Sequence, residues 1–190
     1  MKTAGFDEAG RGPLAGPVYA AAVILPPDFP VELLNDSKQL TEQKREAAAE
    51  LITRYAVWGI ASADAAEIDT INILQASLLA MSRAWDELAR AFPDAAQETG
   101  LNAVVDGLYC PKIPIPCRAM VKADSQVPEV MAASILAKTT RDRIMIEYSL
   151  QYPQYGYEKH KGYPTKAHRE AIARYGPSPI QRLTFTVKPL

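Results

Sequence analysis

The chain has 190 residues, of which 48% are hydrophobic and 23% are charged, and its formal net charge is −1. This size and composition fit one globular domain and exclude a disordered or fibrous protein. No apolar run reaches the roughly 18–20 residues of a membrane span, and the opening residues lack a signal-peptide pattern, so a cytoplasmic protein without a membrane segment is expected.

The first half of the chain alternates strands and helices. Residues 3–9 form an apolar strand before a glycine-rich turn, and residues 18–25, bracketed by Pro17 and Pro26, are too short for a helix of usual length. The two strands are therefore expected to pair as a hairpin. The elements expected next are a helix over 42–54 with Thr41 as its N-cap, a strand over 55–63, a short helix over 64–70 and a long helix over 72–91.

The second half continues this alternation and ends in a basic segment. Strands are expected over 102–106 and 117–123, followed by a largely buried helix over 128–151 that begins at Pro128. A loop over 152–164 and a helix over 166–175, capped by Thr165, complete the chain. The pattern predicts an α/β domain with a mixed sheet flanked by helices, in which residues 152–190 form a small helical, basic appendage that contributes to substrate binding.

Acidic residues lie at or near the ends of three predicted strands. These residues are Asp7, Asp106 and Asp124, with Glu8 next to Asp7. Ligands of α/β sheets gather at strand ends, and carboxylates held together are kept ionised by a divalent cation. Oxygen ligands alone favour Mg²⁺ or Mn²⁺ over zinc. Each aspartate taken singly is also typical of a turn or a helix cap, and strand alternation should turn Glu8 away from Asp7 unless the strand ends or bulges there.

Several segments in order along the chain resemble bacterial ribonuclease HII, the type 2 ribonucleases H. The longest is AGFDEAGRGPLAGPV at residues 4–18, and the others lie at 35–40, 72–76, 105–107, 122–124, 133–138 and 160–165. The resemblance implies a ribonuclease H-like fold. It also implies an endonuclease that cuts the RNA strand of RNA–DNA hybrids and incises on the 5′ side of a single ribonucleotide in duplex DNA.

The same resemblance assigns roles to individual residues. Asp7, Glu8, Asp106 and Asp124 become the carboxylates that hold two Mg²⁺ or Mn²⁺ ions. Residues Gly10, Arg11 and Gly12 match the loop that senses the ribose 2′-hydroxyl, and Tyr163 matches the tyrosine that packs on the sugar of the following deoxynucleotide. Two such ions activate a water and stabilise the leaving 3′-oxygen, so the products would be 5′-phosphate and 3′-hydroxyl ends.

Four further residues are predicted to contact phosphates. Lys38 follows a turn and is expected on a loop. Ser134, Lys138 and Arg141 are spaced to share one stripe of an otherwise apolar helix, which suits a row of phosphates but equally a solvated helix edge.

Charge is distributed unevenly along the chain. Residues 1–137 carry 11 Lys/Arg and 18 Asp/Glu, a net charge of −7, whereas residues 138–190 carry 10 Lys/Arg and 4 Asp/Glu, a net charge of +6. This division is typical of an acidic site beside a basic binding surface, or of a dipolar surface that is only solvated. If the protein is a metal-dependent nuclease, the basic residues of the segment 138–190 are expected to bind the nucleic-acid backbone.

Three other classes of protein agree less well with these residues. A type 3 ribonuclease H usually carries an additional N-terminal domain, for which the six residues before Asp7 leave no room in this sequence. A catalytically silent nucleic-acid-binding protein would not need the acidic set, and a glycosidase with paired carboxylates would not explain the Gly-Arg-Gly turn. No obligate protein partner is evident, and a monomer is expected.

Overall fold

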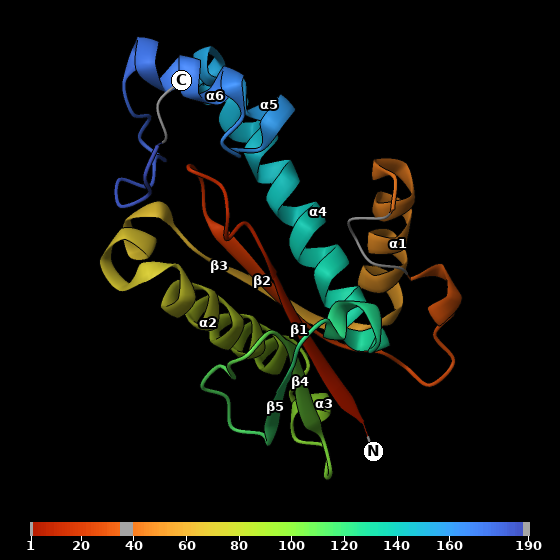
Figure 1. Cartoon of the computed structure of the whole chain (residues 1–190). Helices are drawn as coiled ribbons and strands as arrows, with labels where there is room; N and C mark the ends of the chain where they lie inside the picture. Colours follow the sequence, from red (N-terminus) through yellow and green to blue (C-terminus); the bar gives the residue numbers. More distant parts are fainter. Residues whose placement is uncertain (1, 35–39, 188–190) are drawn as a thin grey trace.

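The computed structural model describes residues 2–34 and 40–187 and contains a mixed five-stranded sheet with helices on both faces (Figure 1). The strands are β1 (Thr3–Ala9), β2 (Val18–Ile24), β3 (Val57–Ala63), β4 (Asn102–Asp106) and β5 (Cys117–Met120). Their order across the sheet is β3-β2-β1-β4-β5. β1 and β2 form the expected antiparallel hairpin, β2 pairs antiparallel with β3, and β1, β4 and β5 run parallel.

The helices include the two whose N-caps were expected from the sequence, at Thr41 and Thr165. They are η1 (Val31–Leu33), α1 (Glu42–Tyr55), α2 (Ala65–Ala91), α3 (Pro93–Ala96), η2 (Ala123–Ser125), α4 (Pro128–Gln151), η3 (Pro153–Tyr155), α5 (Tyr157–His160) and α6 (Lys166–Tyr175), where η marks a 3-10 helix. Thr41 caps α1 and Thr165 caps α6 through their hydroxyls. α2 is broken at Asn72, whose φ is 66°, so the predicted division into two helices near this residue is confirmed.

The two faces of the sheet are covered by different helices. In β1, Phe6 packs on α2 with its ring 6.3 Å from that of Trp85, whereas Gly5 faces α4. A Cβ at Gly5 would lie 2.1 Å from the backbone of Glu129, so glycine allows α4 to pack directly on the strand. Because side chains alternate along a strand, Asp7 lies on the same face as Gly5, toward α4.

Two predicted boundaries were wrong. The strand expected over 117–123 ends at Met120, because Lys122 adopts a left-handed conformation (φ 59°) and η2 begins directly after it. The loop expected over 152–164 contains η3 and α5. Tyr155 and Tyr157 of these short helices are buried against Met145 of α4, and this packing supports helical turns in a segment whose local sequence suggested a loop.

The C-terminal segment is held by α2 and, through the bond from the Arg182 N–H to the Leu14 carbonyl, by the loop before β2. The backbone N–H groups of Leu183 and Thr184 donate to the carboxylate of Asp69 in α2, and Arg182 is fully buried. Among the residues that the structure describes, no helix combines the length and the apolar composition needed to cross a membrane.

Candidate active site

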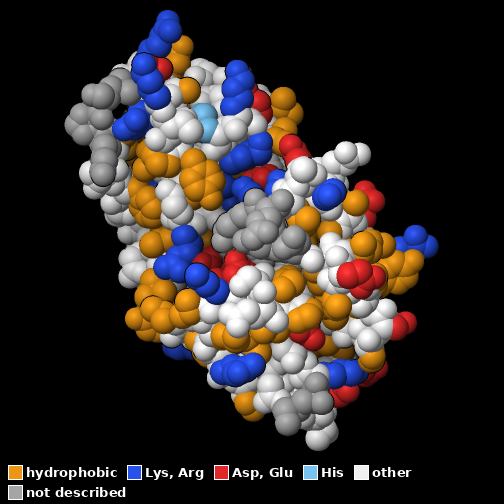
Figure 2. All heavy atoms as spheres, turned by 45° about the vertical axis from the view of Figure 1, so that its right-hand side comes forward, with side chains coloured by type: hydrophobic (Ala, Val, Ile, Leu, Met, Phe, Trp, Pro, Cys, Tyr) orange, Lys and Arg blue, Asp and Glu red, His pale blue; other side chains and the backbone are white. Residues whose placement is uncertain are grey.

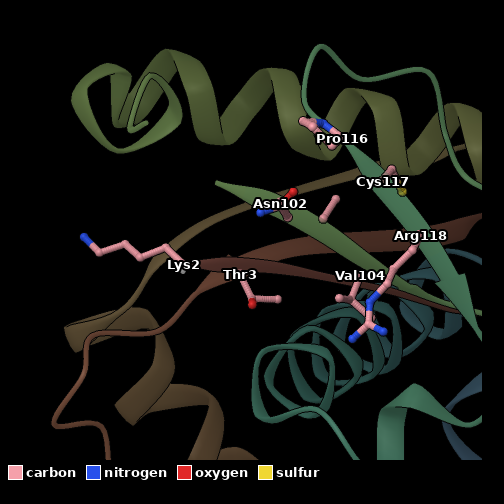
Figure 3. Close-up of a pocket in the computed structure, with 8 residues that line it drawn as sticks. Lys2, Thr3, Asn102, Val104, Pro116, Cys117 and Arg118 are labelled. Atoms are coloured by element: carbon pink, nitrogen blue, oxygen red, sulfur yellow. The ribbon is translucent and has the colours of Figure 1, made fainter. Parts of the chain in front are cut away.

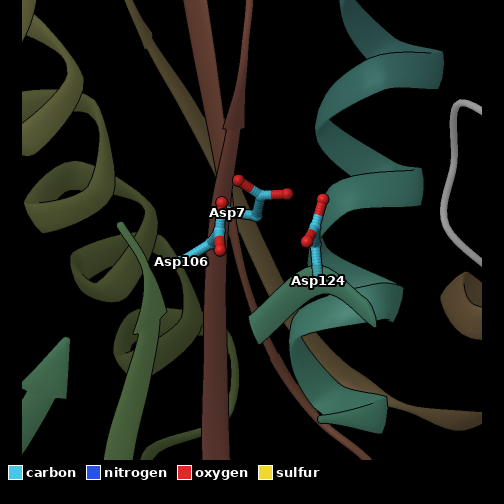
Figure 4. Close-up of side chains that lie close together, drawn as sticks. All are labelled: Asp7, Asp106 and Asp124. Carbon is cyan, nitrogen blue, oxygen red and sulfur yellow. The ribbon is translucent and has the colours of Figure 1, made fainter. Parts of the chain in front are cut away.

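Asp7, Asp106 and Asp124 converge in a gap between the sheet and α4 (Figure 4). One carboxylate oxygen from each residue lies within 4.8 Å of the others. Asp7 and Asp124 are buried, and Asp106 is partly exposed. The carboxylate ends point toward one another, although the three residues come from β1, the end of β4 and η2. The sequence prediction that these three aspartates share one site is therefore consistent with the geometry.

Parallel pairing brings Asp7 and Asp106 side by side. The register pairs Gly5 with Val104 and Phe6 with Val105, so the next residue of each strand is an aspartate. Val104 packs against Val130 of α4, and strand alternation therefore turns Asp106 toward α4 as well. The Ala123 N–H donates to Asp106 Oδ1 at 2.8 Å, which ties this carboxylate to η2.

Asp124 reaches the site by a route different from the expected one. It lies in the single turn of η2, four residues beyond the end of β5, and not at the end of a strand. The left-handed backbone at Lys122 reverses the chain, so that Asp124 enters from the side of α4. The expectation that Asp124 ends its strand was wrong, while its place in the acidic cluster agrees with the prediction.

The protein destabilises the charged form of Asp7. Burial raises its pKa well above the usual range, and the nearby charges of Glu8 and Asp106 raise it further. The Glu8 N–H, 2.7 Å from Asp7 Oδ1, and the Ser134 hydroxyl oppose this shift by donating hydrogen bonds. A buried carboxylate with two acidic neighbours is the environment that a divalent cation stabilises, and the all-oxygen donor set fits Mg²⁺ or Mn²⁺.

Glu8 is not one of the three carboxylates that lie within 4.8 Å of one another, but it lines a cavity with Asp7, and its charge acts on Asp7. β1 continues to Ala9, so strand alternation alone would turn Glu8 away from Asp7, yet both side chains line this cavity. Its carboxylate forms an ion pair of 3.3 Å with Arg11. Arg11 is exposed and lines the same cavity.

The cavity above the carboxylates has a volume of about 600 Å³ and collects most of the predicted substrate-binding residues. Those present are Gly10, Arg11, Gly12, Ser134, Lys138 and Tyr163. Figure 2 shows acidic side chains set among Lys and Arg side chains in the middle of this face. Tyr163 is 41% exposed, and its ring lies 5.9 Å from Lys138 Nζ.

Arg45 also lines this cavity and was not singled out from the sequence. Its guanidinium lies 3.5 Å from Asp142, which also accepts a hydrogen bond of 2.8 Å from Lys138 Nζ. Asp142 thus holds two cations of different helices at one wall of the cavity. Arg45 is one of two adjacent basic residues in a polar helix, and no local signal marks it out before the packing of α1 on α4 is known.

Arg141 does not share the surface of Ser134 and Lys138. It is 1% exposed, and its guanidinium donates to the carbonyl oxygens of Ala15, Pro17 and Lys161. The prediction of a phosphate contact at Arg141 is not supported, because these carbonyls occupy the guanidinium and no exposed surface is left for an anion. Lys38 lies outside the described residues.

The basic C-terminal part is only partly a surface feature. Arg141 and Arg182, two of its ten basic residues, are buried. Other Lys and Arg side chains project at the upper end of the molecule in Figure 2, where α5 and α6 lie in Figure 1. The net charge of +6 therefore overstates the positive charge available to a polyanion.

A second cavity, of about 350 Å³, lies at the opposite end of the parallel strands (Figure 3). Lys2, Thr3, Asn102 and Arg118 line it, where β1, β4 and β5 begin. Lys2 is paired with Glu98 at 2.6 Å. The residues that line this cavity include no acid, whereas Asp7 and Asp106 lie toward the other end of the same strands, where ligands of α/β sheets gather.

Known proteins share this sequence and this fold over nearly the whole chain. The family model "Ribonuclease HII" matches residues 4–188. A ribonuclease HII of Dechloromonas aromatica is 53% identical over 95% of this chain and 89% of that protein. One of Treponema denticola is 55% identical over 98% of each. The crystal structure of ribonuclease H2 from Pyrococcus horikoshii superimposes with a TM-score of 0.74 at 27% identity, over 98% of this chain and 95% of the other. The chain belongs to the ribonuclease HII family and is a type 2 ribonuclease H.

Proposed function

We propose that this enzyme hydrolyses the RNA strand of RNA–DNA hybrids and incises on the 5′ side of a single ribonucleotide in duplex DNA, leaving 5′-phosphate and 3′-hydroxyl ends. The observation that carries this proposal is the convergence of Asp7, Asp106 and Asp124 within 4.8 Å, together with a cavity that is lined by Asp7, the Gly10–Gly12 turn and Tyr163. We also propose that the enzyme is a monomer and acts without an obligate protein partner.

The carboxylates are proposed to hold two Mg²⁺ or Mn²⁺ ions. Asp7 is central, since it is buried and the charges of both Glu8 and Asp106 act on it, and Asp124 of η2 belongs to the same cluster. When bound, such ions supply an activated water and charge stabilisation at the leaving 3′-oxygen. Glu8 is proposed as a further ligand, and its contact with Arg11, at 3.3 Å through one carboxylate oxygen, is compatible with this role.

Recognition of the sugar is assigned to two neighbouring elements. A Cβ built at Gly12 would lie 3.6 Å from Cε1 of Tyr163, so the turn and the ring lie next to each other. Backbone groups of Gly10, Arg11 and Gly12 can approach a 2′-hydroxyl closely because two of these residues lack side chains. The exposed ring of Tyr163 offers a flat surface to the next sugar without selecting a base.

Phosphates of the bound strand are assigned to the cationic side chains of the cavity. Lys138 and Arg45, both held by Asp142, face the cavity together with Ser134. Charge-assisted hydrogen bonds from these groups would fix the backbone and carry no sequence information. Lys38 remains a predicted contact.

The test compares a DNA duplex containing one ribonucleotide with the same duplex made wholly of DNA, each with Mg²⁺ or Mn²⁺. Cleavage of the first alone, at the 5′ side of the ribonucleotide, and its loss with EDTA or in Asp7→Asn are expected. Absence of cleavage by the wild-type protein with either metal would contradict the proposal.

Arg11 separates recognition from chemistry in the same assay. Arg11→Ala removes an exposed side chain and its ion pair but keeps the two glycines, so the rate should fall less than in Asp7→Asn. Equal rates for Arg11→Ala and wild type would mean that the Arg11 side chain does not take part in recognition of the ribose, although the backbone of the turn still could.

A further inference from the structure

Arg141 connects two segments that are far apart in the sequence. From α4, its Nε donates to the Pro17 carbonyl at 3.0 Å and one Nη to the Ala15 carbonyl at 3.2 Å. Its other Nη donates to the Lys161 carbonyl at 3.0 Å. Two bonds thus hold the segment after Gly12, and one holds the turn before Tyr163.

A second buried arginine holds only the first of these segments. Arg182 is 0% exposed. Its guanidinium donates to the carbonyl oxygens of Gly10, Arg11, Pro13 and Gly16 at 2.6–3.0 Å. Together the two guanidinium groups bind most of the carbonyls between Gly10 and Pro17, which leaves this loop little freedom to move.

The turn that carries Tyr163 rests directly on the loop. Leu14 N–H donates to the Gly162 carbonyl at 2.8 Å. Gly162 has φ +84°, and a Cβ there would lie 2.5 Å from the Ala15 carbonyl oxygen. The backbones therefore meet at the place where Arg141 bonds to both, and the Arg141 guanidinium carbon lies 6.0 Å from the centre of the Tyr163 ring.

We propose that Arg141 is a positioning residue that sets the distance between the Gly10–Gly12 turn and Tyr163, and thereby the selectivity for a ribose followed by a deoxyribose. This inference rests on the proposed function, in which the turn recognises the first sugar and Tyr163 packs on the second. The turn and the tyrosine ring can recognise a ribose followed by a deoxyribose only when the distance between them matches the distance between successive sugars of the strand. A residue that fixes this distance therefore determines selectivity without touching the substrate.

The chemistry of arginine suits this role. A guanidinium presents its donors in one plane, so it can bind carbonyls of two segments in fixed directions, whereas a lysine ammonium offers a single point of charge. Burial lowers the pKa of Arg141 to about 10, which still leaves it protonated at neutral pH. The guanidinium is therefore a permanent charged donor between neutral acceptors.

The test is a double-mutant cycle on the duplex with one ribonucleotide. Arg141→Lys is expected to lower kcat/KM by about tenfold, the loss of roughly one charge-assisted hydrogen bond. Tyr163→Ala should lower kcat/KM strongly in the wild-type background and much less in Arg141→Lys, because the ring is already misplaced there. Selectivity over a uniform RNA–DNA hybrid should fall in Arg141→Lys.

Arg143→Lys is the control, since Arg143 lies on the same helix as Arg141 but pairs at the surface with Glu46 of α1. Its effect and that of Tyr163→Ala should multiply. Multiplicative effects of Arg141→Lys and Tyr163→Ala would overturn the inference while leaving the proposed function intact. A wild-type enzyme that does not cut this duplex would instead refute the proposed function.

A second variant covers the case in which Arg141→Lys does not fold, as judged by its thermal unfolding. Gly162→Ala keeps Arg141 and pushes the turn off the loop, through contact with the Ala15 carbonyl. The same loss of the Tyr163→Ala effect is expected. A full Tyr163→Ala effect in Gly162→Ala would show that spacing does not matter and would overturn the inference.

Discussion

The imidazole Nδ1 of His168 lies 3.0 Å from the carbonyl oxygen of Tyr163. His168 is fully buried and stacks on His160, with ring centres 4.5 Å apart. The Nδ1 of His160 in turn accepts the Gly162 N–H at 3.2 Å. One buried imidazole, His168, and one partly buried imidazole, His160, therefore hold the backbone next to the exposed Tyr163, the ring proposed to contact the sugar.

This arrangement predicts a loss of stability in mild acid. Burial is the largest effect on both histidines, and it lowers their pKa below the ordinary value of 6.5. The unfolded chain then binds protons that the folded chain excludes, so the free energy of unfolding falls as the pH drops below about 6.5. Thermal unfolding followed between about pH 7.5 and pH 5.5 measures the fall.

His168→Phe provides the control for the pH prediction. Phenylalanine keeps an aromatic ring on His160 but does not titrate, so the decrease of Tm with falling pH should be smaller than in the wild type. Carboxylates titrate equally in both proteins, and the difference between the two slopes therefore isolates His168. Identical slopes would mean that His168 contributes nothing to the acid response.

Local sequence patterns located the acidic site because its geometry follows from strand periodicity. Asp7 and Asp106 end apolar segments, and parallel pairing of those segments places them together. Asp124 lies in the acidic cluster but not at the strand end where the sequence placed it, since nothing in the residues 120–124 signals the left-handed backbone at Lys122. Chain reversals of this kind depend on the packing of η2 against α4.

Side chains that act across long sequence distances could not be assigned from spacing. Helical periodicity places Arg141 near Lys138, but it does not reveal that the loop before β2 covers one flank of α4 and buries the guanidinium. Arg182 and Arg45 were overlooked for the same reason. An arginine inside an otherwise apolar helix is the one available signal, because such a charge must find partners.

Asp7→Asn should stabilise the metal-free protein while abolishing its activity. Ionised Asp7 is opposed by burial and by Glu8 and Asp106, so its folded pKa is raised and its charge weakens the fold at neutral pH. An increase in Tm is expected, at roughly 2–4 °C per kcal/mol for a chain of this size. Asp142→Asn is the comparison, since it removes a carboxylate paired with Lys138 and Arg45 and should lower Tm. A lower Tm for Asp7→Asn would show that its hydrogen bonds outweigh the repulsion.

Divalent cations should reverse that order of stability. A cation that binds only the folded protein raises its free energy of unfolding by about 2.7 kcal/mol at a hundredfold excess over Kd. Mg²⁺ or Mn²⁺ is therefore expected to raise the Tm of the wild type and of Asp142→Asn, but not of Asp7→Asn. Asp106→Asn should also lose the shift, because its carboxylate belongs to the cluster. Equal shifts in wild type and Asp7→Asn would place the bound ion elsewhere.

Gly5 and Gly59 offer a test of how the sheet positions the site. A Cβ at Gly5 would lie 2.1 Å from the backbone of Glu129 in α4, and one at Gly59 would lie 2.2 Å from the Ala84 carbonyl in α2. Alanine at either position must displace a helix, at a cost of about 1–3 kcal/mol in the free energy of unfolding. Only α4 carries Ser134, which bonds to Asp7, and only α4 follows directly from η2 with Asp124. Gly5→Ala should therefore lower kcat of the folded enzyme at least tenfold more than Gly59→Ala, as single-turnover rates below both Tm values would measure. Equal rates in the two variants would mean that the carboxylates tolerate a displaced α4.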